Sequence, residues 1–303
     1  MNSRVSAILI TLAGCSGNLD PPSLVNKLRV LAVRAQVPNP EPSAPQFSDA
    51  HPGDRVTLDA LVAGLEGDVD GGVTADMVDY LWFACTPPPG STSVRDCTGL
   101  AAGMVGFLPT CQDQPSASAC LLGASATVVY PTATDAPAPS SLYVAVVVAA
   151  KPDGALECLG RLGGGQPSGD SCVVALKTLT IQPASVMRNQ NPAVTGFLAN
   201  GNDIHSVPSF KLNQKLMLVP QFQPSVSEVK PDRTNEVLTL SWFATQKDFD
   251  HFHSGFSVQP PIENPNNTYT NQSTMSGHVR FWLVLRDDRG GVDWTDGAAD
   301  FTM

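Results

Sequence analysis

The sequence is poor in charge, and what charge it has is mainly acidic. Charged residues make up 15% of the 303 residues, and the formal net charge at pH 7 is −10. Soluble proteins average about 25% charged residues. No basic cluster occurs anywhere along the chain. Because nucleic-acid phosphates are bound by clustered lysine and arginine, we expect no nucleic-acid partner.

Recognisable catalytic motifs are also missing. The chain has no P-loop, G-x-G-x-x-G, H-E-x-x-H or G-x-S-x-G pattern. Ser171, in Gly169-Asp170-Ser171, resembles a trypsin-type nucleophile turn, but Cys172 follows where that turn needs a glycine. A serine nucleophile also needs a positioned base, and the nearest preceding histidine is His51 in a turn-like His-Pro-Gly. We therefore expect a polar hairpin at Ser171 and predict no enzymatic activity.

Two groups of residues have the chemistry of metal ligands. His251 and His253 would share one face of a strand, with Asp248 or Asp250 nearby. The acidic turns Asp68-Val69-Asp70 and Asp287-Asp288 could offer oxygens to calcium, but they lack the EF-hand spacing. Asp and Gly are ordinary turn residues, and histidines between phenylalanines suit a loop. We predict no metal and no cofactor.

The chain contains an internal repeat with an offset of 160 residues. Residues 80–84 (Tyr-Leu-Trp-Phe-Ala) recur at 240–244 (Leu-Ser-Trp-Phe-Ala), and residues 56–58 match 216–218. The apolar stretches 142–148 and 279–285 are also alike, and each precedes a polar turn that ends in glycine. The first copy holds about 24 extra residues before this last stretch. The repeat predicts two modules of one fold.

The repeated segments have the alternation of strands. Alternate residues share a face in three segments: Val56, Leu58, Ala60 and Val62; Tyr80, Trp82 and Ala84; and Phe281, Leu283 and Leu285. Residues 28–33 and 193–198 are the expected first strands of the two copies. These patterns predict an all-β fold class that looks like two tandem antiparallel Ig-like β-sandwich domains at 27–182 and 183–303. Residues 183–192 would link the modules into a rod.

Three pieces of the chain carry a family resemblance: residues 28–35, the two Trp-Phe-Ala strands, and residues 286–292. They resemble the Ig-like or PKD-like modules of predicted lipoproteins from large-genome Gram-negative bacteria, notably myxobacteria. The resemblance covers most of the chain and implies a fold, but it implies no chemistry.

The N-terminal end resembles a bacterial lipoprotein signal. Residues 5–14 form an apolar run of signal-peptide length, too short to span a bilayer, which needs about 20 apolar residues. The run ends in Leu12-Ala13-Gly14-Cys15, similar to the lipobox. The resemblance implies a signal peptide at 1–14, a diacylglyceryl group on Cys15, and a lipid-anchored tether at 15–26. The alternative is an ordinary secretory signal with a chance cysteine.

Setting Cys15 aside leaves an even number of cysteines, all in the first copy: Cys85, Cys97, Cys111, Cys120, Cys158 and Cys172. An oxidising compartment would favour three disulfides, and six cysteines allow 15 pairings. A sequence-local pairing would join Cys85 to Cys97, Cys111 to Cys120, and Cys158 to Cys172. A zinc site is the alternative, although no C-x-x-C occurs.

These features predict a non-catalytic cell-envelope lipoprotein of the outer membrane that binds or supports other molecules. Its expected partners are the membrane, through lipid on Cys15, and an envelope protein or glycan. Tyr269, Phe252 and Trp294 are candidates for an exposed aromatic patch. The alternatives are an envelope hydrolase with a site in the cysteine-rich insertion at about 85–120, and an accessory subunit of a secretion or surface assembly.

Overall fold

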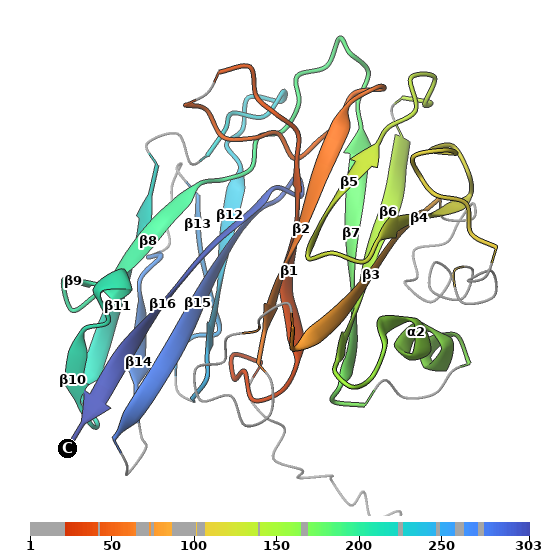
Figure 1. Cartoon of the computed structure of the whole chain (residues 1–303). Helices are drawn as coiled ribbons and strands as arrows, with labels where there is room; N and C mark the ends of the chain where they lie inside the picture. Colours follow the sequence, from red (N-terminus) through yellow and green to blue (C-terminus); the bar gives the residue numbers. More distant parts are fainter. Residues whose placement is uncertain are drawn as a thin grey trace, which may run out of the picture.

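A computed structural model describes residues 22–41, 43–64, 73, 76–86, 101, 107–138, 140–164, 169–223, 227–246, 249–257, 264–271 and 276–303. The chain is all-β, with short helices between strands (Figure 1). The elements of the first sandwich are β1 Arg29–Gln36, β2 Arg55–Ala63, β3 Val78–Cys85, β4 Ala119–Gly123, β5 Thr127–Pro131, β6 Ser140–Ala150, α2 Ala155–Gly163 and β7 Cys172–Ile181. Those of the second are β8 Val194–Ala199, β9 Asn202–Asp203, η1 Ile204–Ser206, β10 Ser209–Lys211, β11 Lys215–Phe222, β12 Val237–Ala244, β13 His253–Ser257, β14 Asn267–Thr270, β15 Gly277–Asp287 and β16 Val292–Thr302.

The two sandwiches share one topology, as the repeat predicts. The first has sheets β1-β2-β5 and β4-β3-β6-β7, and the second has the equivalent sheets β14-β11-β8-β9 and β10-β16-β15-β12-β13. Trp82 and Trp242 occupy equivalent places and are fully buried. Each indole N–H donates a hydrogen bond, to the Ser125 carbonyl at 2.8 Å and to Ser254 Oγ at 2.9 Å. The extra length of the first copy falls between β3 and β4.

The predicted strand faces are confirmed. Val56, Leu58, Trp82 and Ala84 lie in the core of the first sandwich, and Tyr80, Ala60 and Val62 pack against it. Phe281, Leu283 and Leu285 lie in the core of the second. Alternation is the expected pattern for a strand with one face on a core.

The second faces of β6 and β15 are buried too. In β6, Val144, Val146 and Val148 face the core of the first sandwich, while Ala145, Val147 and Ala149 lie in a cluster with α2. In β15, Trp282 and Val284 point away from the core of the second sandwich, into a separate cluster. Burial on both faces explains why both strands read as nearly continuous apolar runs.

The separate cluster joins the sandwiches face to face. It contains Leu31, Ala32 and Ala63 from β1 and β2, together with Phe243, Trp282, Val284 and Val292 from β12, β15 and β16. The sandwiches therefore lie side by side as four stacked sheets (Figure 1). The in-line rod expected from the tandem repeat is wrong, because the outer face of β1 and β2 is apolar and is covered by the second sandwich. We call this contact the module interface.

The segment before β1 also belongs to this interface. Ser23, Leu24 and Val25 are buried, and Val25 N–H donates to the Ala244 carbonyl at 2.8 Å. In return, Ala244 N–H donates to the Ser23 carbonyl at 3.0 Å. The expected tether at 15–26 is therefore too long at its C-terminal end, because residues 23–25 are packed on the second sandwich. Cys15 lies outside the described residues.

Buried disulfides cross-link the first sandwich. Cys111 is bonded to Cys120 and Cys158 to Cys172, as the local pairing predicts. The second bond ties α2 to the start of β7 over the buried face of β6. Cys85 is disulfide-bonded as well, and Cys97 lies outside the described residues. None of the described helices is long and apolar enough to cross a membrane.

Candidate functional site

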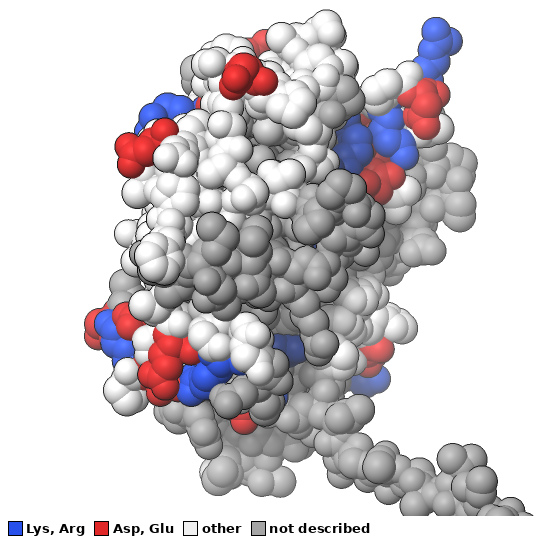
Figure 2. Space-filling model, turned by 90° about the vertical axis from the view of Figure 1, so that its right-hand side faces the viewer, with Lys and Arg blue, Asp and Glu red and all other residues white. Residues whose placement is uncertain are grey.

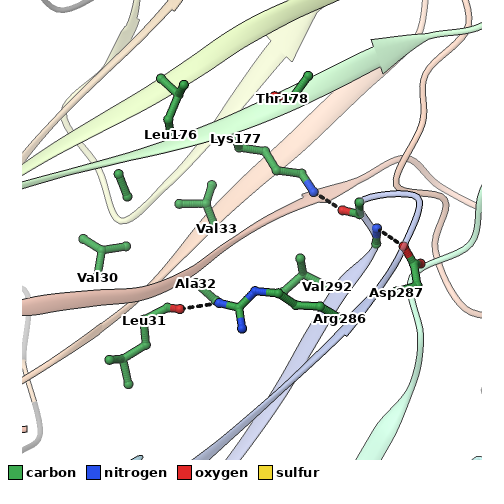
Figure 3. A pocket seen from close by; sticks show the side chains of 13 residues that line it. Val30, Leu31, Ala32, Val33, Leu176, Lys177, Thr178, Arg286, Asp287 and Val292 are labelled. Carbon is green, nitrogen blue, oxygen red and sulfur yellow. Dashed lines mark hydrogen bonds between the residues drawn. The ribbon is translucent and has the colours of Figure 1, made fainter. Parts of the chain in front are cut away.

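A cavity of about 420 Å³ opens at the module interface. Three segments line it: residues 30–33 of β1, residues 175–178 of β7, and the β15–β16 turn with its flanks (Arg286, Asp287 and 290–292). β1 and β7 are edge strands of the two sheets of the first sandwich, and the turn comes from the second sandwich. Figure 3 shows these side chains converging on the cavity. We call it the interface cavity.

Two cationic side chains cross the interface beside the cavity in opposite directions. Lys177 reaches from β7 of the first sandwich and donates to the Gly290 carbonyl of the second. Arg286 reaches from β15 of the second and donates to the Leu31 carbonyl of the first at 2.7 Å (Figure 3). Arg286 also donates to Ser241 Oγ at 3.0 Å. Each cation therefore satisfies a backbone acceptor of the other sandwich.

Burial dominates the electrostatics of these two cations. It lowers the pKa of Lys177 to about 8; the Asp287 and Asp49 carboxylates oppose this, and the Arg286 charge adds to it. Burial also lowers the pKa of Arg286. Among the described residues, neither cation has a carboxylate oxygen within 4.0 Å. Buried charges are ordinarily paired, so this arrangement is unusual.

Asn189 and Asn191, in the link between the sandwiches, are buried and polar. Asn189 Nδ2 donates to Ser48 Oγ at 2.8 Å and to Asp287 Oδ2 at 2.9 Å. Asn191 Nδ2 donates to the Ala35 carbonyl at 2.8 Å, and its Oδ1 accepts from Val292 N–H at 2.8 Å. The link therefore bonds to both sandwiches at once and fixes their relation.

Ion pairs add to the interface at its rim. Arg34 of β1 donates to Asp293 Oδ1 of β16 at 2.6 Å, and its guanidinium lies 4.1 Å from the centre of the Trp294 ring. Burial raises the pKa of Asp293, against the Val194 N–H bond and the Arg34 charge. Close by, Arg289 pairs with Glu236 at 2.6 Å and also pairs with Glu228, which accepts from Gln190 N–H at 3.0 Å.

The expected exposed aromatic patch is wrong. Tyr269 is fully buried in the second core, where its ring packs edge-on against Phe281 at 4.8 Å. Phe252 and Trp294 are half-buried and pack against the module interface. Tyr269 on β14 and Trp294 on β16 alternate with polar neighbours, and the sequence pattern alone does not say which face of a strand is covered.

The other residues considered for chemistry have structural partners. Ser171 lies in the turn before β7, and because α2 stands between β6 and β7 the expected hairpin is wrong. The Ser171 Oγ donates to Asp153 Oδ2 at 2.8 Å, and Asp153 also pairs with Arg161. His253 Nδ1 lies 3.1 Å from Ser241 Oγ. Asp287 Oδ1 accepts from Arg289 and Gly291 N–H, so it shapes the turn.

No group of three or more His, Cys, Asp or Glu that could hold a metal occurs within the described residues. Asp68, Asp70 and Asp248, as well as most of the cysteine-rich insertion, lie outside them.

The surface of the first sandwich carries charges of both signs. Where the described residues are visible in Figure 2, Lys and Arg lie beside Asp and Glu near the two ends of the face. The described atoms between the ends are mostly uncharged. This face has no basic surface of one sign that would suit nucleic acid, among the residues shown.

Comparison with solved structures gives matches of low sequence identity and low TM-score. No protein-family model matches the chain, and no curated protein matches it. The fibronectin(III)-like modules of Clostridium thermocellum CbhA are 8% identical, over 90% of this chain and 94% of that chain, with a TM-score of 0.22. The tandem Ig repeats of Dlar are 9% identical, over 89% and 97%, with a TM-score of 0.23. Bacteroides ovatus SGBP-B, in complex with a mixed-linkage heptasaccharide, is 8% identical, over 91% and 48%, with a TM-score of 0.20.

Proposed function

We propose that this chain is a cell-envelope lipoprotein that acts as a rigid, non-catalytic binding or structural unit, anchored by lipid on Cys15. The lipobox-like residues 12–15 support the anchor, and the packing of residues 23–25 on the second sandwich next to the module interface supports a rigid unit. An anchor at Cys15 would then hold both sandwiches through the seven intervening residues, 16–22. An extended chain spans about 3.3–3.6 Å per residue, so this spacer reaches about 25 Å.

The short spacer implies an orientation. β1 begins beside the packed N-terminal segment and ends in residues 37–54, at the opposite end of the molecule (Figure 1). The link between the sandwiches lies at the same opposite end, and Phe47 bridges to Gln190. We call this the linker end, made of residues 37–41, 43–54, 182–193 and 227–236. In an anchored molecule the linker end would face away from the membrane.

The linker end has properties of a recognition surface. Arg188 pairs with Asp54 at 2.7 Å, and its guanidinium lies 4.0 Å from the centre of the Phe47 ring, which holds two loops together. Met187 stands beside this contact with 74% of its surface exposed. Loops held on a rigid scaffold are the usual place for binding. We propose that an envelope protein or glycan is recognised here.

The anchor is tested by labelling with radioactive palmitate in a bacterium that processes lipoproteins. The wild-type chain is expected to incorporate label and sediment with membranes, and Cys15→Ala is expected to lose both properties. Cys15→Ala that kept the label would end the lipoprotein proposal.

The recognition surface is tested by site-specific photo-crosslinking in intact cells. A photoreactive residue at Met187 is expected to give a discrete adduct. The matched control is Met217, which is 53% exposed on β11 of the second sandwich. Equal adducts at both positions, or none at Met187, would remove the linker end as the binding surface.

A further inference from the structure

The interface cavity has the size of a small-molecule site. Its volume of about 420 Å³ falls within the roughly 300–1,000 Å³ of typical ligand pockets. It lies where three segments far apart in sequence meet, a common place for such sites. Its walls come from two sandwiches that the linker asparagines hold in a fixed relation.

The walls of the cavity are mainly apolar. Val30, Val33, Leu176 and Val292 contribute branched side chains, with Leu31, Ala32 and Ala175 beside them (Figure 3). An apolar group that covered these side chains would be favoured by about 25 cal/mol per Å² of buried apolar surface.

The polar part of the cavity is cationic. Lys177 is 8% exposed, and the Gly290 carbonyl is its one hydrogen-bond acceptor among the described residues, although an ammonium has three donors. Among the residues that the structure describes, Arg286 uses two of its five N–H donors, on Ser241 Oγ and on the Leu31 carbonyl. The Asp287 carboxylate does not bond directly to either cation: its oxygens accept from Asn189, Arg289 and Gly291.

An anion would complete this arrangement. The Arg286 charge disfavours the charge on Lys177, so the two cations repel one another across a poorly solvated space. A carboxylate accepts strong hydrogen bonds from both guanidinium and ammonium groups. It would add a directly bonded counter-charge to the more distant Asp287 and Asp49 carboxylates.

We propose that the interface cavity binds a small carboxylate with a short apolar body. The carboxylate lies at the cationic end formed by Arg286 and Lys177, and the body lies against Val30, Val33 and Val292. This site is distinct from the linker end, and the inference does not depend on a lipid anchor or on an envelope partner.

The test uses the full chain in lipid nanodiscs and hexanoate as the probe, with empty nanodiscs as the blank. Methyl NMR spectra follow Val30, Val33 and Val292 during the titration. Hexanoate is expected to shift these methyl signals saturably, and hexanamide, the uncharged match, is expected to bind at least about tenfold more weakly because it lacks the charge.

Two variants distinguish the contribution of the Lys177 charge to binding from that of the open volume of the cavity. Lys177→Met keeps length and removes charge, and it is expected to weaken hexanoate binding by about tenfold. Ala175→Leu fills the cavity without changing charge, and it is expected to abolish binding while the remaining methyl spectrum stays native. If one variant fails to fold, the other still tests whether hexanoate binds in the interface cavity. The proposal is overturned if hexanoate gives no saturable shift, if hexanamide binds equally, or if the folded variants bind as the wild type does.

Discussion

The Asn189 side chain donates a hydrogen bond of 2.9 Å to the Asp287 carboxylate, and so joins the link to the last β-turn of the second sandwich. The same Nδ2 also donates to Ser48 of the first sandwich, while the Asn189 carbonyl accepts from Ser48 N–H at 2.7 Å. The Asn189 side-chain oxygen is buried with no partner among the described atoms. An asparagine in this setting fixes one arrangement of three segments at some cost in desolvation.

We expect Asn189→Ala to lower the free energy of unfolding by about 2–3 kcal/mol. The substitution leaves Ser48 Oγ and Asp287 Oδ2 buried without their shared donor, which incurs most of the desolvation penalty of those groups. Urea unfolding measures the change. The control is Asn202→Ala at an exposed position, expected to change stability by about 0.5 kcal/mol or less. Equal effects at both positions would contradict a structural role for Asn189.

The ion pair between Arg34 and Asp293 is expected to couple the sandwiches measurably. Their side chains are only 20% and 18% exposed, so the pair is less screened than a surface salt bridge. A double-mutant cycle with Arg34→Met and Asp293→Asn should give a coupling energy of about 1–3 kcal/mol. The exposed pair of Lys27 and Asp170, changed in the same way, is the control and should give less than about 0.5 kcal/mol. A coupling near zero for the first pair would refute the prediction.

The sequence predicts each sandwich well and their arrangement poorly. The repeat and the alternation of Val56, Leu58 and Trp82 identify the strands, because one buried face leaves a period-two signal. The alternation does not predict that the outer face of β1 is buried, because Leu31 and Ala32 are ordinary residues for a strand. Whether such a face meets solvent or another sandwich depends on the whole surface, and so the side-by-side packing could not be inferred.

Two features of the sequence relate to the interface cavity and its surroundings, but only weakly. Lys177 is the only charged residue within β7, an otherwise largely apolar strand. Asn189 and Asn191 stand two apart in a predicted link, a spacing that puts both on one side of an extended chain. Neither signal identifies its partners, because Gly290 and Asp287 lie about 100 residues further along the chain. The sequence pattern points instead to aromatic residues of the second copy, of which Tyr269 lies in the core and Phe252 and Trp294 pack against the module interface.

Introducing a charge into the packed N-terminal segment is expected to release it from the second sandwich. Val25 is 3% exposed, so Val25→Asp would bury an unpaired carboxylate among apolar side chains. Hydrogen exchange of the Ala244 amide, which donates to the Ser23 carbonyl, should then accelerate by more than about tenfold. Lys27→Asp, two residues on at an exposed position, serves as the control and should leave this amide protected. If the exchange rate of the Ala244 amide were unchanged in Val25→Asp, the N-terminal segment would not protect this strand of the second sandwich.

Lys177 is expected to make stability rise with pH under alkaline conditions. Burial lowers its pKa from 10.5 to about 8 in the folded protein, so between these values the unfolded chain binds more protons than the folded one. The free energy of unfolding then increases as pH rises through this window, and the cost of the buried charge is fully present below pH 8. From pH 7.5 to 9.5 we expect a gain on the order of 1–2 kcal/mol in urea unfolding. Burial raises the pKa of Tyr80 and Tyr130, whose ionisation opposes this gain at higher pH, so the series ends at 9.5. Lys177→Met should remove most of the slope, whereas Lys27→Met, at an exposed position, should keep it. A wild-type profile as flat as that of Lys177→Met would show that Lys177 is not held as a costly buried cation.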